Sequence, residues 1–190
     1  MTTPRPDLLQ RLDVQKAERE QANLRRRLRT IDHVDGPWFQ TGGRRLLSFC
    51  SNDYLGLAQH PSLVAALTRA AHEQGIGSTS AHLICGHRAA HAQLEEALAA
   101  WTGRERALLF STGYMANLGV MQALLARGDV CVQDKLNHAC LLDGARLSGA
   151  ELKRYPHADA AAAARQLAAH PDAAALLATD GVFSMDGDVA

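Results

Sequence analysis

The chain has 190 residues, 47% of them hydrophobic and 21% charged, and its 20 lysines and arginines are balanced by 20 aspartates and glutamates. This composition excludes an intrinsically disordered chain, which would be poorer in apolar residues and further from neutrality, and it lacks the basic excess of a general nucleic-acid binder. Because no apolar stretch approaches the roughly 20 residues of a membrane span and the N-terminus lacks the apolar core of a signal peptide, we expect a soluble cytoplasmic protein.

The cysteines are far apart in the sequence and form no Cys-x-x-Cys pair; they are Cys50, Cys85, Cys131 and Cys140. Such a pattern indicates neither a zinc site nor a disulfide framework. We therefore expect reduced thiols and no bound metal.

The N-terminal segment predicts a polar arm followed by a strand. The first 30 residues carry eight Arg or Lys against four Asp or Glu, and they predict a helix with an apolar side formed by Leu8, Leu9, Leu12, Leu24 and Leu28. Turn residues follow at 35–37 and 41–43, and residues 45–49 predict a short strand.

Two helices are predicted next. Pro61 suits the first turn of a helix, and the apolar spacing from Leu63 to Ala71 predicts a helix that stops at Gly75. After a loop at 77–80, residues 89–101 predict a second helix that Gly103 closes.

The remainder alternates between strands and helices. Short apolar runs predict buried strands at 107–110, 130–132 and 174–178, with a more polar strand at 151–155. Helical stretches lie at about 114–126, 138–147 and 159–169. This alternation predicts an α/β fold, in which a mostly parallel sheet is flanked by helices and ligands bind at the carboxyl ends of the strands.

Three polar loops follow predicted strands and should converge on one edge of the sheet. In the first, at 108–117, Gly113 lets a ligand approach the backbone, and free N–H groups at the helix start can hold a phosphate. The second places His138 at the same edge, and the third, at 179–188, carries hydroxyl and acidic groups. The structural alternatives are a helix cap, a surface histidine and a polar turn, but convergence favours a shared site.

Four ordered segments resemble the α-oxoamine synthases, which are pyridoxal-phosphate (PLP) enzymes of fold type I: SNDYLGL at 51–57, FSTGYMANL at 110–118, DKLNHACLLDGARLSGA at 134–150 and VFSMDGD at 182–188. The resemblance implies pyridoxal 5'-phosphate as cofactor and a homodimer with sites at its interface. It also implies an N-terminal helical arm and small-domain segment at 1–50, followed by the N-terminal part of the PLP-binding large domain at 51–190.

The same resemblance implies cofactor contacts for four residues. Gly113 and Tyr114 would lie at the cofactor phosphate and ring edge. His138 would stack on the pyridine ring and is the candidate catalytic residue, while Ser184 would hydrogen-bond near the phenolic oxygen.

Substrate contacts are also implied. Asn52 would help hold the amino-acid carboxylate, Arg25 would meet the acyl substrate, and His138 would also be a substrate-binding residue. The triplet 25–27 has a second interpretation, as a solvated helix face. In the family the corresponding loop usually contains more glycine than residues 77–79 do. A role for this loop at the phosphate site of a dimer partner therefore stays open.

Within the family, the arginine cluster and the segment GYMANLGV favour the member that condenses L-alanine with pimeloyl-CoA or pimeloyl-acyl carrier protein in biotin biosynthesis. Sister enzymes that make 2-amino-3-oxobutyrate, 5-aminolevulinate or 3-oxosphinganine remain alternatives, as does a catalytically silent homologue. A nucleotide-binding module is disfavoured, because neither GxGxxG nor a P-loop motif follows a strand.

The family's Schiff-base lysine and pyridine-nitrogen aspartate lie downstream of VFSMDGD. The lysines of this chain, Lys16, Lys135 and Lys153, are not in the Thr/Ser-x-x-Lys context of that residue. We therefore expect the 190 residues to be the N-terminal portion of such an enzyme and to be inactive alone.

Overall fold

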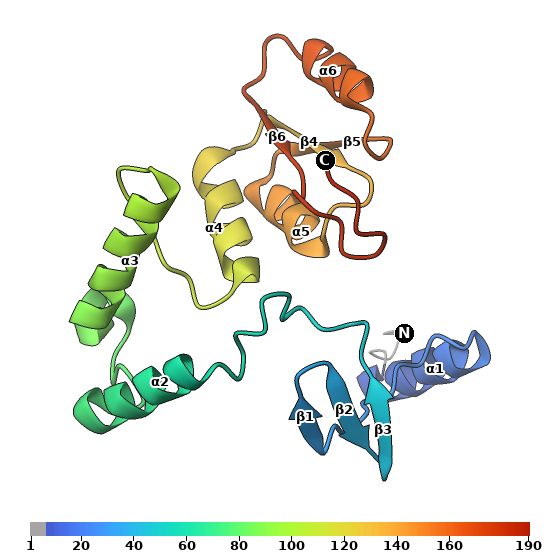
Figure 1. Cartoon of the computed structure of the whole chain (residues 1–190). Helices are drawn as coiled ribbons and strands as arrows, with labels where there is room; N and C mark the ends of the chain where they lie inside the picture. Colours follow the sequence, from blue (N-terminus) through green and yellow to red (C-terminus); the bar gives the residue numbers. More distant parts are fainter. Residues whose placement is uncertain (1–6) are drawn as a thin grey trace. The chain divides into compact units, whose positions relative to one another are not determined.

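The computed structural model describes residues 7–190, which fall into two units, residues 7–77 and residues 78–190. The first unit combines helices with a small antiparallel sheet, and the second is a layered structure of helices and parallel strands (Figure 1). Within residues 7–190, no helix is long and apolar enough to cross a membrane.

The first unit begins with helix α1, Leu8–Gln21, which the Asp7 carboxylate caps. The helix ends in a Schellman motif, because Asn23 adopts a φ of 55° and the Leu24 N–H donates to the Arg19 carbonyl at 2.8 Å. The predicted helix is therefore too long, and the last two of its five predicted apolar positions lie outside it. Asparagine tolerates the left-handed conformation that ends the helix, which apolar periodicity does not reveal.

The first unit also contains an antiparallel sheet with the strand order β1-β2-β3. Its strands are β1, His33–Asp35; β2, Trp38–Thr41; and β3, Arg44–Leu47. Gly42 and Gly43 have φ values of 54° and 73°, as the type I′ turn of a two-residue hairpin requires. The sequence predicted only the third strand, because β1 and β2 are too short to show alternation and the turn residues between them suggested a loop.

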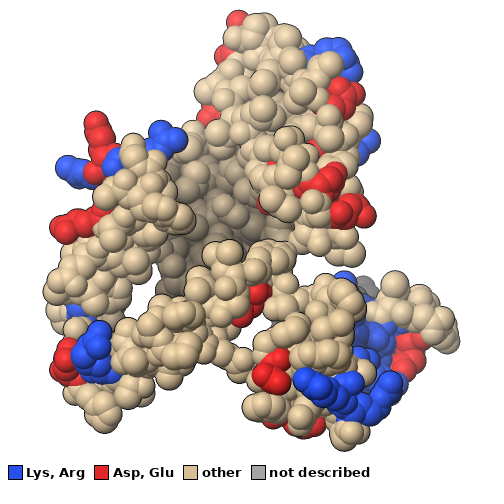
Figure 2. All heavy atoms as spheres, in the orientation of Figure 1, with Lys and Arg blue, Asp and Glu red and all other residues tan. Residues whose placement is uncertain are grey.

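Helix α2, Pro61–Gln74, confirms the predicted helix, with proline in its first turn and Gly75 at a φ of 75° after its end. Basic side chains gather on part of the surface of this unit. Figure 2 shows Lys and Arg side chains gathered over the part of the chain that contains α1 and the antiparallel sheet.

The second unit contains four helices, three strands and a short π-helical turn. The helices are α3, Ala89–Thr102; α4, Gly113–Leu124; α5, Ala139–Ser148; and α6, Ala160–Ala168. The strands are β4, Val130–Asp134; β5, Glu151–Tyr155; and β6, Ala175–Ala178, and the turn is η1, His82–Gly86. The strands form a parallel sheet in the order β5-β4-β6, which confirms the predicted α/β class.

The central strand β4 is buried at all five positions, and helices cover both of its faces. Cys131 packs with Met121 of α4 and Ala145 of α5, whereas Val132 packs with Ala163 of α6. Since successive side chains of a strand point to opposite faces, the uninterrupted apolar run at 130–132 is the pattern of a strand buried on both sides.

The predicted strand at 107–110 is wrong. These residues belong to no strand among residues 7–190; instead the Leu109 N–H donates to the Glu95 carboxylate of α3 at 3.0 Å. An apolar run shows that a segment is suited to a sheet, but a strand also requires a neighbouring strand to pair with.

Candidate active site

Helix α4 begins in the first predicted site loop. Thr112 caps it, because the Thr112 Oγ1 accepts the Met115 N–H at 3.1 Å. The N–H groups of Gly113 and Tyr114 stand in the first turn, where the helix itself provides no acceptor. A Cβ added to Gly113 would meet no heavy atom within 4 Å, so the space beside this residue is open. The arrangement suits an anion held by backbone N–H groups.

His138 is the N-cap residue of helix α5. Its Nδ1 accepts the backbone N–H of Cys140 at 3.2 Å and lies 2.8 Å from the Cys140 Sγ. Because Nδ1 acts as an acceptor there, the neutral ring carries its proton on Nε2. The residue is exposed, so this Nε2–H is available to donate to a ligand.

The loops after β4 and β6 are fastened together by side chains. The buried Asn137 donates from Nδ2 to the Ala178 carbonyl at 2.8 Å and accepts the Asp180 N–H on Oδ1 at 3.1 Å. The His138 N–H in turn donates to the Asp180 carboxylate at 2.6 Å. The position of His138 is therefore set by two strand ends, as expected for loops at one edge of a parallel sheet.

Helices α4 and α5 are joined close to their N-termini. The Tyr114 hydroxyl donates to the Asp143 carboxylate at 3.3 Å, and the Asn117 Nδ2 donates to the Cys140 Sγ at 3.0 Å. Partial desolvation and the Asp143 charge raise the pKa of Tyr114 above its ordinary value. Gly113, Tyr114 and His138 thus belong to a single connected group of residues.

A second network joins the ends of all three parallel strands. His157 follows β5; its Nδ1 lies 3.1 Å from the carboxylate of Asp134, at the end of β4, and its Nε2 lies 2.5 Å from that of Asp188, after β6. These two contacts, that with Asp188 foremost, raise the pKa of His157. The buried Asp134 loses hydration, but the N–H groups of Leu136 and Ala158 and the His157 ring bind it and lower its pKa.

The network also anchors the loop that contains Ser184. This residue is exposed in a turn directly after the buried Phe183, whose ring meets that of His157 edge-on at 4.4 Å. The Phe183 N–H donates to the Asp188 carbonyl at 2.9 Å. Ser184 thus lies in a loop whose base is fixed by the aromatic contact and by the Asp188 ion pair.

Two of the three predicted substrate residues, Arg25 and Asn52, belong to the first unit, whereas His138 belongs to the second. Arg25 follows the end of α1 and pairs with Glu20, whose other oxygen accepts a hydrogen bond from Arg27 at 3.1 Å. Asn52 is exposed in the irregular segment after β3. Because the helix ends at Gln21, the alternative interpretation of the arginine triplet as a solvated helix face is wrong.

Several residues of these networks were not singled out from the sequence. They are Asn117, Asp143, His157 and Asp180. Each acts on a residue between 23 and 43 positions away, so no local motif contains both partners. Asp180 closely follows a predicted buried strand, and this position was the available signal, whereas Asn117 and Asp143 lie within helices and had no such signal.

The geometry fits a phosphorylated aromatic ring. The first turn of α4 provides backbone donors beside open space, and the tethered α5 places an exposed imidazole in the same connected group. Helix N-termini attract phosphate, and an imidazole can stack on an aromatic ring. These are two of the contacts that PLP would require from this part of the chain.

Comparison with known proteins gives a consistent result. The chain is 57% identical over 187 residues to the 8-amino-7-oxononanoate synthase of Stenotrophomonas maltophilia, covering 98% of this chain and 46% of that protein. The serine palmitoyltransferase of Sphingomonas wittichii matches with a TM-score of 0.89 and 34% identity, over 97% of this chain and 48% of that one. The serine palmitoyltransferase of S. paucimobilis, with a bound PLP–myriocin aldimine, matches with a TM-score of 0.88 and 30% identity. This match also covers 97% of this chain and 48% of that one.

The chain therefore spans about half the length of the curated relatives it matches. The structural likeness confirms the predicted fold of the type I PLP enzymes over that part. The family described as aminotransferase class I and II matches residues 44–190. With this match over most of its length, the chain belongs to the class I and II aminotransferase family.

Proposed function

We propose that this chain provides the cofactor-stacking and substrate-contacting part of a PLP-dependent acyltransferase that condenses L-alanine with a pimeloyl thioester. The product would be 8-amino-7-oxononanoate, an intermediate of biotin biosynthesis, and the working enzyme a homodimer. The observation that carries the proposal is the joining of the α4 and α5 N-termini, which places Gly113, Tyr114 and His138 in one connected group. The 57% identity to a synthase of this specificity supports the choice of substrates.

Each site residue has a distinct task in this proposal. The N–H groups of Gly113 and Tyr114 would bind the cofactor phosphate, and the His138 ring would stack on the pyridine and could donate its Nε2–H to the substrate. Ser184 would donate to the phenolic oxygen. The cofactor, when bound, supplies the electron sink that makes carbon–carbon bond formation at an amino acid feasible.

Arg25 and Asn52 would contact the two substrates. Asn52 would hold the alanine carboxylate by hydrogen bonds, and Arg25 would exchange its Glu20 partner for an anionic group of the acyl substrate. The basic surface around α1 and the antiparallel sheet supports this assignment, because both coenzyme A and acyl carrier protein are anionic (Figure 2).

A PLP titration of the 190-residue chain tests the cofactor site. A stacked ring contributes roughly 0.5–1.5 kcal/mol beyond its buried area, so replacing the imidazole by methyl should weaken binding by about tenfold at most. We expect His138→Phe to retain PLP better than His138→Ala. The exposed His72 of α2 provides the control: His72→Ala should bind like the parent. Equal, parental affinity in both His138 variants would contradict stacking.

Turnover is tested by joining this chain to the remaining half of the S. maltophilia relative. The joined protein should form 8-amino-7-oxononanoate from L-alanine and a pimeloyl thioester, and the His138 variants should form less. A preference for glycine with acetyl-CoA would move the protein to a sister activity. Retained PLP binding without any turnover would instead indicate a catalytically silent homologue.

A further inference from the structure

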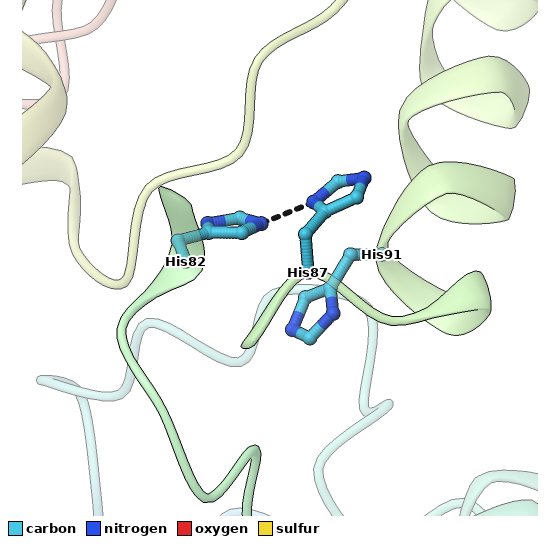
Figure 3. A group of neighbouring side chains, drawn as sticks. All are labelled: His82, His87 and His91. Carbon is cyan, nitrogen blue, oxygen red and sulfur yellow. Dashed lines mark hydrogen bonds between the residues drawn. The ribbon is translucent and has the colours of Figure 1, made fainter. Parts of the chain in front are cut away.

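Three histidines outside the candidate active site meet at the start of helix α3. His82 opens the turn η1, His87 follows it, and His91 lies in the first turn of α3. Figure 3 shows their rings side by side, with the His82 Nε2 hydrogen-bonded to the His87 Nδ1. The ring centroids lie 4.5 to 5.6 Å apart. One ring nitrogen from each residue lies within 4.8 Å of the other two.

The local backbone explains why these rings meet. His87 and His91 are four residues apart across the beginning of a helix, a spacing that brings side chains together. Gly86 lets the preceding turn fold back tightly, because a Cβ at this position would lie 2.2 Å from the Ser80 carbonyl oxygen. The turn therefore returns His82 to the helix start.

A carboxylate supports the group from one side. The Glu95 Oε2 lies 3.9 Å from the His87 Nε2, and its Oε1 accepts the Leu109 N–H at 3.0 Å. Metal-binding imidazoles usually direct the ring nitrogen that does not bind the metal at such a carboxylate or carbonyl. The negative charge of Glu95 thus favours a proton on the His87 Nε2, which makes Nδ1, the nitrogen that contacts the His82 Nε2, the candidate metal ligand.

We propose that His82, His87 and His91 bind a divalent transition-metal ion of the zinc type, with water in the remaining position. Nothing in the proposed acyltransferase chemistry uses this site. Three neutral imidazoles suit zinc, copper and nickel, whereas magnesium and calcium prefer oxygen ligands. The site contains no cysteine, so the cysteine spacing from which no metal was expected carries no information about it.

Small side-chain movements are enough to form the site. Zinc–nitrogen bonds of about 2.0–2.1 Å in tetrahedral geometry place the ligand nitrogens about 3.3 Å apart. His82 and His87 are exposed and can rotate to this spacing. Both line an open pocket of about 640 Å³ that also reaches Ser111, which gives the ion and its water a path from solvent.

His91 limits the affinity of the three-histidine site for zinc. Its Nδ1 accepts the Arg88 N–H at 3.0 Å as part of the capping box of α3. Coordination through Nε2 would require the ring proton on Nδ1, which ends that acceptor role. Metal binding therefore competes with helix capping, and the site binds zinc more weakly than a fully preorganised one.

Zinc titration of the 190-residue chain by isothermal calorimetry tests the proposal, with His82→Asn, His87→Asn and His91→Gln as variants. Gln in place of His91 keeps a capping acceptor, so loss of binding there would not reflect a lost cap. We expect one zinc per chain and at least about tenfold weaker binding in each variant, since even outer-shell substitutions cost 10–100-fold. His72→Asn should bind like the parent, and Mg²⁺ should not bind.

Cysteine participation is tested separately, because the exposed Cys85 lies within η1. Cys85→Ser should retain zinc, and Co²⁺ bound to the parent should show no thiolate charge-transfer band. Parental zinc affinity in all three histidine variants would overturn the proposal. So would a loss of binding in Cys85→Ser, which would assign the ion to a thiolate.

Discussion

The backbone N–H of His138 donates to the carboxylate of Asp180, 42 residues further along the chain, at 2.6 Å. This bond crosses from the loop after β4 to the loop after β6. It fixes the residue proposed to stack on the cofactor through a group that belongs to another strand end. The orientation of His138 therefore depends on the assembled sheet as well as on its own helix.

Replacement of Asp180 by Ala should loosen this attachment. A hydrogen bond to a charged group contributes about 1.5–3 kcal/mol to the free energy of unfolding. We expect a loss at the lower end of this range, because the His138–Asp180 bond is exposed. Hydrogen exchange at the His138 amide should accelerate and PLP should bind more weakly. Asp180→Asn retains an acceptor oxygen and serves as the matched control. Unchanged exchange at His138 in Asp180→Ala would show that the bond does not hold the loop.

Packing between α4 and α5 should not tolerate a side chain at Gly144. A Cβ there would lie 2.8 Å from the Met121 Cγ and 3.2 Å from the Asn117 backbone oxygen. We expect Gly144→Ala to lower the free energy of unfolding by about 1–3 kcal/mol, as overpacking does, and denaturant unfolding measures it.

Gly119, in α4, provides the comparison. A Cβ there would meet only the partly exposed Phe110 ring, at 3.1 Å, which can rotate away. Gly119→Ala should be neutral or stabilising, because alanine is favoured over glycine in a helix by about 1 kcal/mol. Equal destabilisation by both alanines would mean that the α4–α5 contact is not specially tight.

The His157 bridge should make stability depend on pH. Its two carboxylate partners raise the pKa of His157, so the bridge contributes fully below about pH 6.5 and is lost as the pH rises through the raised value. Asp134 has a lowered pKa, so its contribution is present above about pH 3.9 and is lost as the pH falls through the lowered value.

Melting temperatures of the parent and His157→Asn test this dependence. Their difference should be largest between about pH 5 and 6 and should shrink towards about pH 9. His170→Asn, which alters a histidine outside the bridge, should show no comparable trend. A parent-to-variant difference that stays constant across this range would show that the ring does not act as a cation.

The sequence predicted the parts of the fold that local patterns determine. Strand β4 carries a continuous apolar run, and helices α2 to α6 carry caps. The predicted bounds of these elements lie within a few residues of the observed bounds. The segment 107–110 was assigned wrongly because pairing is a property of two segments. Similarly, a turn and a motif were enough to propose Gly113 and His138 as site residues. His157 could not be proposed in this way, because both of its partners are brought to it only by the folded sheet.

The parallel sheet has two unlike edges. Among residues 7–190, β5 and β6 each pair only with β4, which leaves the outer side of each unpaired. Strand β5, with the sequence ELKRY, carries three charged side chains that oppose pairing with another chain, whereas β6, with the sequence ALLA, carries neither charge nor proline. Concentrated protein should therefore associate through β6, and a lysine in place of the half-exposed Leu177 should keep it dispersed.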